Sequence, residues 1–274
     1  MSRLLLTVFC LALPAAGWAQ QPVARPSPDA SSNTTVAVPQ QMRRAEPPSP
    51  TASAQELEAG GDTLKEQKLY ADSIDYYEAA LKKNGPPALL HNKIGICELQ
   101  MLRYDAARKE FERALKIEKA YPEALNNLGV AYYSKKSYRN AIRNYEKAIA
   151  LRDTSASFHS NLGTAYFARK DYDKANQEYL RALELDPDIF EHRGMGGISL
   201  QLISAEERAR YNYTVAKMYA RVGNADRSLL YLRKALEEGY DKIENVYKDA
   251  EFAALRKDPR FTQLMAAKPL AIPQ

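Results

Sequence analysis

Apolar residues in the central part of the chain recur three and four residues apart, the spacing that places side chains on one face of an α-helix. Residues 122–155 show this pattern in two runs, with Leu125, Leu128 and Tyr132 in the first and Ile142, Tyr145 and Ile149 in the second. The two runs predict a pair of antiparallel helices. Prolines fall between such pairs, where a helix must end or can begin, at positions 86, 87, 122 and 187.

The same pattern returns every 34 residues. Three sets of positions keep one phase, namely Gly61, Gly95, Gly129 and Gly163; Tyr77, Phe111, Tyr145 and Tyr179; and Ala80, Ala114, Ala148 and Ala182. One helix pair cannot bury its apolar face alone, so pairs of fixed period must stack on one another. We therefore predict an all-α fold in which the repeats are 54–87, 88–121, 122–155 and 156–189.

The sequence resembles the tetratricopeptide repeat (TPR) family. The family signature Leu-Gly-x-x-Tyr, Ala-x-x-x-Phe, Ala and Pro appears as Leu128-Gly129-x-x-Tyr132, Ala141-x-x-x-Tyr145 and Ala148, and again in the fourth repeat, where it includes Pro187. The resemblance implies a right-handed α-solenoid of antiparallel helix pairs. It specifies the fold better than the function, since the family serves many partners.

The beginning of the chain has the composition of a segment for export. Arg3 is followed by an apolar run too short to span a bilayer and then by small residues, which predicts a signal peptide over 1–19. Residues 20–53 hold seven of the fifteen prolines and few large apolar residues, so we expect a disordered linker. The expected localisation is exported, either periplasmic or secreted, and the sequence predicts no membrane span.

The 34-residue phase breaks after the fourth repeat. Residues 190–204 contain Gly194-Met195-Gly196-Gly197 and then alternating apolar residues, which predict a short non-helical insertion such as a β-hairpin. A phosphate-binding loop would need a lysine followed by a hydroxyl residue after the glycines, and this arrangement is absent. Ser204 and Glu207 form a capping-box pattern, so we expect a degenerate fifth repeat over 205–240, followed by capping helices and a tail over 241–274.

The residues that could carry chemistry do not form a pattern. His91 and His159 share one repeat position 68 residues apart, which indicates a packing role, while His192 stands alone in the insertion. Cys97 falls at a small core position. We expect no catalytic residues, no metal and no cofactor. The net charge of +5 is small, and the lysines and arginines alternate with acidic residues along the helices. We therefore predict no nucleic-acid partner.

The resemblance implies that the first helices of the repeats line a groove for a protein or extended peptide partner. The corresponding groove residues are Leu89, Asn92, Ile96, Leu99, Gln100, Asn126, Val130, Tyr133, Ser160, Thr164 and Phe167. Amides beside apolar side chains suit an uncharged extended segment, although the same residues would also be compatible with a face that contacts water or is covered by the insertion. Glu58, Asn92, Asn126 and Ser160 replace the lysine with which related grooves bind an acidic C-terminus.

These features together predict a non-enzymatic TPR scaffold or adaptor of the bacterial cell envelope. One alternative is an accessory assembly factor for a pilus, secretion or polysaccharide-export machine. A second alternative is an enzyme subunit that uses the 190–204 insertion with His192.

Overall fold

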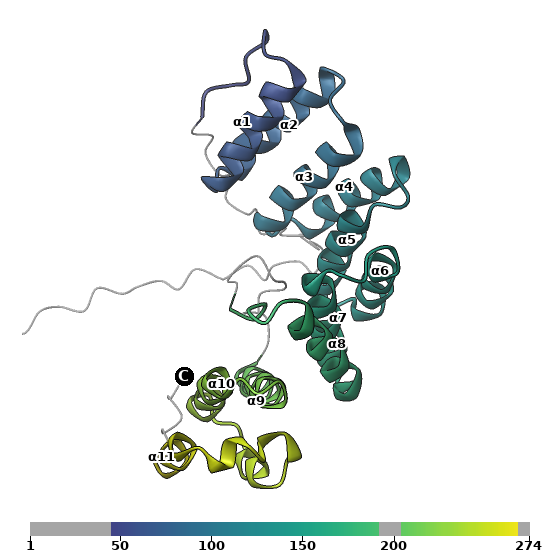
Figure 1. The fold of residues 1–274 in the computed structure, drawn as a ribbon. Coiled ribbons are helices and arrows are strands. Elements are labelled where there is room, and N and C mark those ends of the chain that lie inside the picture. The colour runs from purple at the N-terminus through teal and green to yellow at the C-terminus, as the bar shows by residue number, and fades with distance from the viewer. Residues whose placement is uncertain (1–44, 192–203, 268–274) are drawn as a thin grey trace, which may run out of the picture. The chain divides into compact units, whose positions relative to one another are not determined.

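The computed structural model describes residues 45–191 and 204–267, and the described residues are almost entirely helical (Figure 1). Helices α1 to α8 form four consecutive antiparallel pairs, with the bounds α1 Ala54–Glu66, α2 Tyr70–Lys82, α3 Pro87–Gln100, α4 Tyr104–Ile117, α5 Pro122–Ser134, α6 Tyr138–Leu151, α7 Ala156–Ala168 and α8 Tyr172–Leu185. Within the described ranges there is no β-strand. The predicted all-α solenoid of helix pairs is confirmed.

The two helices of each pair cross where a glycine faces an aromatic ring. A Cβ atom at Gly129 would lie 2.4 Å from Cε1 of Tyr145, and one at Gly95 would lie 2.5 Å from Cε1 of Phe111. These distances are well inside van der Waals contact, so only glycine permits this approach of the helices. The glycines and the aromatic residues that recur every 34 positions therefore pack against each other within each pair.

The turn inside each regular pair uses a residue in the left-handed backbone region. Lys68, Leu102, Lys136 and Lys170 have φ angles of 62°, 60°, 58° and 62°. This conformation costs a side-chain-bearing residue about 1 kcal/mol relative to glycine. The repeat therefore reproduces the same backbone turn even though the residue at its tightest point is not a glycine.

A fifth pair, α9 (Ala205–Arg221) and α10 (Ala225–Glu237), follows the gap in the described residues. The capping box predicted at its start is present, since Ser204 Oγ accepts from the Glu207 amide and the Glu207 carboxylate accepts from the Ser204 amide. The turn residue is Gly223, with a φ of 78°. The predicted hairpin, His192 and the glycine cluster lie outside the described residues.

Part of the predicted disordered linker makes defined contacts with α2. The Ala45 amide donates to Asp72 Oδ1 at 3.0 Å, Tyr76 OH donates to the Glu46 carbonyl at 3.3 Å, and Lys83 Nζ donates to the Pro50 carbonyl at 2.8 Å. Ala45, Glu46 and Pro50, within the predicted linker, are thus each held by a hydrogen bond to a residue of the first pair. An extended proline-rich segment leaves its carbonyls unpaired, and Tyr76 of α2 and Lys83 directly after α2 donate to two of them.

The segment after α10 contains three short 3₁₀ turns, η2 (Ile243–Tyr247), η3 (Ala250–Phe252) and η4 (Leu255–Lys257), and helix α11 (Pro259–Ala267). Their buried side chains belong to the same apolar cluster as α9 and α10, the main members being Val246, Phe252, Leu255, Phe261, Leu264 and Met265. The last described helices therefore cover an apolar face of the fifth pair. No helix in the described part of the chain has the length and apolar character that a membrane span requires.

Candidate partner-binding face

A chain of asparagine amides links the first helices of three successive pairs. Asn161 Nδ2 donates to Asn126 Oδ1 at 2.9 Å, Asn126 Nδ2 donates to Asn127 Oδ1 at 3.2 Å, and Asn127 Nδ2 donates to Asn92 Oδ1 at 3.0 Å. The Asn92 amide reaches Tyr121 OH at 3.5 Å. All four amides donate in one direction, so the bonds polarise one another. The Oδ1 atom of Asn161 ends this asparagine chain, buried and without a hydrogen-bond donor among the described residues.

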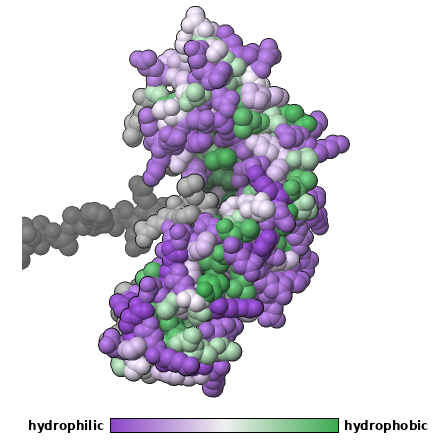
Figure 2. All heavy atoms as spheres, in the orientation of Figure 1, coloured by the Kyte–Doolittle hydropathy of each residue, from purple (hydrophilic) through white to green (hydrophobic). Residues whose placement is uncertain are grey.

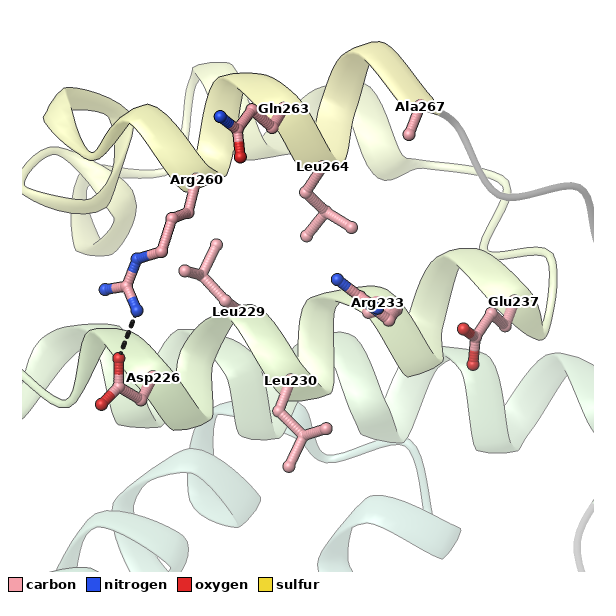
Figure 3. Close-up of a pocket in the computed structure, with 9 residues that line it drawn as sticks. All are labelled: Asp226, Leu229, Leu230, Arg233, Glu237, Arg260, Gln263, Leu264 and Ala267. Carbon is pink, nitrogen blue, oxygen red and sulfur yellow. Dashed lines mark hydrogen bonds and ion pairs between the residues drawn. The ribbon is translucent and has the colours of Figure 1, made fainter.

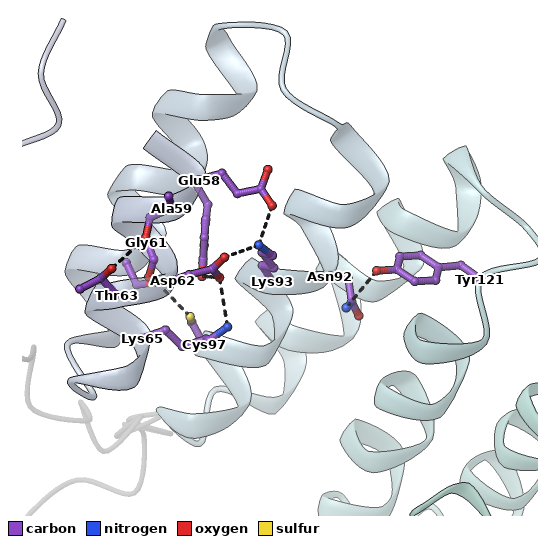
Figure 4. Close-up of polar contacts among 12 residues, drawn as sticks. Glu58, Ala59, Gly61, Asp62, Thr63, Lys65, Asn92, Lys93, Cys97 and Tyr121 are labelled. Carbon is purple, nitrogen blue, oxygen red and sulfur yellow. Dashed lines mark hydrogen bonds and ion pairs between the residues drawn. The ribbon is translucent and has the colours of Figure 1, made fainter. Parts of the chain in front are cut away.

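The first two pairs are joined by charged groups instead of amides (Figure 4). Lys93 Nζ on α3 lies 2.6 Å from Glu58 Oε1 and 2.6 Å from Asp62 Oδ2 on α1. Tyr77 OH and Lys65 Nζ also donate to Asp62, at 2.7 Å and 3.1 Å. This group of residues satisfies its own charges.

The pKa values in this cluster reflect the pairing. Partial burial opposes the charged form of Lys93, but its hydrogen bonds to Asp62 and Glu58 outweigh burial and raise its pKa. Burial of Asp62 acts toward a higher pKa, and the hydrogen bonds from Lys93, Tyr77 and Lys65 lower it overall. Both groups therefore stay charged and paired, and the cluster presents no free cation to an acidic ligand.

The two aromatic residues of the predicted groove, Tyr133 and Phe167, are buried. Tyr133 is 4% exposed and Phe167 is 6% exposed. The Tyr133 ring packs at 5.2 Å from Tyr138, and the Phe167 ring packs at 5.3 Å from Tyr172 and 5.8 Å from Tyr211. In this structure both rings pack against other aromatic side chains, and a ligand would have to displace those neighbours to contact a ring face.

The other predicted groove residues divide into two groups. Asn92, Asn126, Ser160 and Thr164 are buried, and Thr164 Oγ1 accepts a hydrogen bond from Tyr179 OH while donating to the Ser160 carbonyl. The partly or fully exposed members lie on α3 and α5, and they are Leu89, Ile96, Leu99, Gln100 and Val130. We call the exposed set, together with the half-buried Asn127, the first-helix face. The surface in Figure 2 is largely hydrophilic with smaller hydrophobic patches, as expected for such a mixture.

Sequence reasoning missed Lys93 as a member of this face and did not include Asn127 and Asn161 among the groove residues. The three residues are spaced by 34 positions and occupy the same place in successive repeats. This periodic spacing could have indicated that the three residues share one position on the first helices. Their role depends on bonds to residues about one repeat away, which the position in the repeat does not specify.

The histidines and the cysteine within residues 45–191 have structural partners. His91 Nδ1 lies 2.8 Å from Glu110 Oε2, and His159 Nδ1 lies 2.7 Å from Glu178 Oε2. Cys97 is fully buried, its Sγ lies 3.5 Å from Ser73 Oγ, and burial raises the pKa of its thiol. Among the described residues no group of histidine, cysteine, aspartate and glutamate could hold a metal ion.

Comparisons of the sequence with known families agree with this geometry. Families described as TPR repeat and tetratricopeptide repeat match residues 59–116, 103–136, 131–168 and 156–189. A search of curated proteins found no match. The matched segments adjoin or overlap one another, and together they include most of α1 and the whole of α2 to α8.

Solved structures with a similar fold include the following three proteins. TTC0263, a thermophilic TPR protein of Thermus thermophilus, is 18% identical with a TM-score of 0.49, covering 78% of this chain and 100% of its own. YrrB, a TPR protein with an unusual peptide-binding site, is 18% identical with a TM-score of 0.46, covering 72% and 91%. The pilF protein of Pseudomonas aeruginosa is 18% identical with a TM-score of 0.50, covering 72% and 82%. At this identity the likeness concerns the fold alone, and the family matches identify residues 59–189 of this chain as tetratricopeptide repeats.

Proposed function

We propose that this protein is a non-enzymatic scaffold or adaptor of the bacterial cell envelope that binds an extended, uncharged segment of a protein partner. The observation that carries the proposal is the composition of the first-helix face. It partly exposes aliphatic side chains at Leu89, Ile96 and Val130. The nearby carboxylates of Glu58 and Asp62 are neutralised by Lys93 and Lys65. A ligand with a net charge would find no unpaired opposite charge in this cluster.

Asn127 supplies the polar component of this proposed contact. It is half-buried, and its amide is already oriented by the bonds to Asn92 and Asn126. A side chain held in this way loses little rotamer freedom when it binds the backbone of an extended peptide. Amides that bond the backbone and aliphatic residues that contact alternate side chains make up a common mode of peptide recognition.

Affinity capture with matched variants tests the proposal. Leu89→Asp and Val130→Asp each introduce a charge on the first-helix face, whereas Leu151→Asp changes an exposed leucine on α6, the second helix of its pair. Partners captured from envelope extracts by the wild-type protein should be lost with both face variants and retained with Leu151→Asp. Capture that is equal for all three variants would exclude this face as the binding surface.

Export is the second part of the proposal, and the apolar run with small residues over 1–19 supports it. Mass spectrometry of the protein recovered from cells should show a mature chain that begins at Gln20. Recovery of a full-length chain from the cytoplasmic fraction alone would contradict export without affecting the binding face.

A further inference from the structure

A groove of about 820 Å³ lies between α10 and α11 (Figure 3). Leu229 and Leu230 of α10 and Leu264 and Ala267 of α11 contribute its apolar lining. This volume is in the range of ordinary binding pockets. The groove lies on different helices from the first-helix face, so it calls for its own explanation.

Leu230 is apolar at a position that is polar in each regular pair. Ser228 Oγ donates to the Ala216 carbonyl at 2.8 Å, as Ser73 Oγ donates to the Gly61 carbonyl at 2.7 Å, so α10 aligns with α2 and Leu230 with Asp75. The same position in the other second helices is Lys109, Arg143 or Gln177. Leu230 is nevertheless 41% exposed. Leu230 therefore adds an apolar side chain to the groove where the regular pairs carry a polar one.

The edge of the groove carries one arginine held by two aspartates, and two charged side chains without a partner among the described residues. Arg260 at one end is held by Asp226 at 2.6 Å and by Asp258 at 2.7 Å. Arg233 and Glu237 lie one turn apart on α10, and neither makes an ion pair or side-chain hydrogen bond with any described residue. A partner with charge of one sign would pair with one of them and leave the other unpaired.

We propose that the groove is the contact between two copies of this chain. The two copies of α10 lie antiparallel about a twofold axis, so that Arg233 pairs with Glu237 of the partner subunit and Glu237 pairs with the partner subunit's Arg233. Such an isologous contact is the commonest form of dimer and satisfies both unpaired charges with one surface. Burial of the groove supplies the affinity, and the charge pairs set the register.

The same register accounts for the exposed leucine. In this arrangement the axis passes midway between Arg233 and Glu237, and Leu230 lies five residues from it, about 7.5 Å along the helix. Leu230 of each copy therefore approaches the end of the other groove that is formed by Glu237 and Ala267 (Figure 3). One geometry thus covers the leucine and pairs both charges.

A charge-reversal cycle in sedimentation velocity tests this proposal on the purified protein over a roughly hundredfold range of concentration, in which mass action shifts a monomer–dimer equilibrium. The wild-type protein should shift from monomer to dimer. Arg233→Glu and Glu237→Arg each place like charges opposite one another at two sites, so each should weaken the dimer at least about tenfold. The double variant Arg233→Glu/Glu237→Arg restores both pairs with inverted signs and should recover the dimer.

Leu230 provides an independent arm of the same experiment. Leu230→Asp, which introduces the residue found at Asp75, should also favour the monomer, whereas Leu230→Met should retain the dimer. Unchanged helical circular dichroism and melting temperature separate loss of association from unfolding. A wild-type protein that is monomeric at every concentration, a dimer that none of the variants weakens, or a double variant no better than the single ones would overturn the proposal.

Discussion

The regular pairs and the fifth pair solve the same packing problem in different ways. In the first four pairs the helices cross at a glycine that lies against Tyr77, Phe111, Tyr145 or Tyr179. In the fifth pair the corresponding residues are Ala216 and Leu232, identified through the matching bonds of Ser73 and Ser228. A large ring requires a glycine opposite it, whereas a leucine leaves room for a methyl group. The glycine and aromatic residues of the 34-residue signature are therefore one combination that lets two helices cross closely. Ala216 and Leu232 are another combination that fills the same space.

The largest expected effect comes from adding a methyl group at a regular crossing. Gly129→Ala would place its Cβ atom 2.4 Å from Cε1 of Tyr145, which is fully buried and cannot move aside. We expect a loss of about 3 kcal/mol of unfolding free energy, at the upper end of overpacking effects. Urea denaturation followed by circular dichroism measures this loss.

The fifth pair provides the matched control for that substitution. Ala216→Gly removes a methyl group where Leu232 stands opposite, so it should cost only about 1 kcal/mol, mainly through lower helix propensity. Similar losses of unfolding free energy for the two variants would show that contact with the aromatic ring is not the reason for a glycine at the crossing position.

The next largest expected loss of stability comes from breaking the asparagine chain. The fifth pair has no counterpart to this chain. Tyr213 and Thr214 occupy the two amide positions there, and Tyr213 OH donates to Asp249 Oδ2 at 2.7 Å instead. Asn126→Ala removes the acceptor of the buried Asn161 amide and should cost about 2 kcal/mol. A double-mutant cycle of Asn126→Ala with Asn161→Ala should show coupling, and strictly additive losses would exclude a connected chain.

His159 in the fourth repeat makes a pH-dependent contribution to stability. Burial of His159 opposes its protonation, but the hydrogen bonds to Glu178 and to the Asp153 carbonyl outweigh this and raise its pKa. Because the pKa is higher in the folded state, the stabilisation is complete below the unfolded value of about 6.5 and is lost as the pH rises through the folded value.

His159→Leu introduces the residue that the third repeat has at Leu125, and it tests this contribution. Urea denaturation at a series of pH values should show the wild-type protein losing unfolding free energy relative to the variant as the pH rises above about 6.5. A constant difference between the two proteins across this range would mean that His159 does not titrate in the folded state.

The smallest effect concerns the turns. Leu102 has a φ of 60° and is 65% exposed, so Leu102→Gly relieves backbone strain without removing a buried contact. We expect a gain of about 0.5 kcal/mol, since the added entropy of the unfolded glycine offsets part of the relief. Gly223→Ala in the fifth pair should have the opposite effect, a loss of about 1 kcal/mol, because its φ is 78° and no neighbouring atom would contact the new Cβ. Thermal melts compare the two variants.

Much of the fold could be read from the sequence because its determinants are local. Helical spacing, prolines between pairs and the capping box at Ser204 depend on residues within one or two turns of each other. The glycine and aromatic ladders depend on contacts about 16 residues apart that every period repeats, as between Gly129 and Tyr145. Local periodicity thus carried enough information to place the helix pairs.

The candidate site depended on packing between pairs, which local periodicity does not encode. The angle at which each pair meets the next determines whether a first-helix residue is exposed, as Val130 partly is, or enclosed by rings, as Phe167 is. It also brings Lys93 to Glu58 and Asn161 to Asn126, each across 35 residues. The sequence by itself determined the repeating helices, and the tertiary structure decided which of their polar groups bond to one another and which side chains are left for a partner.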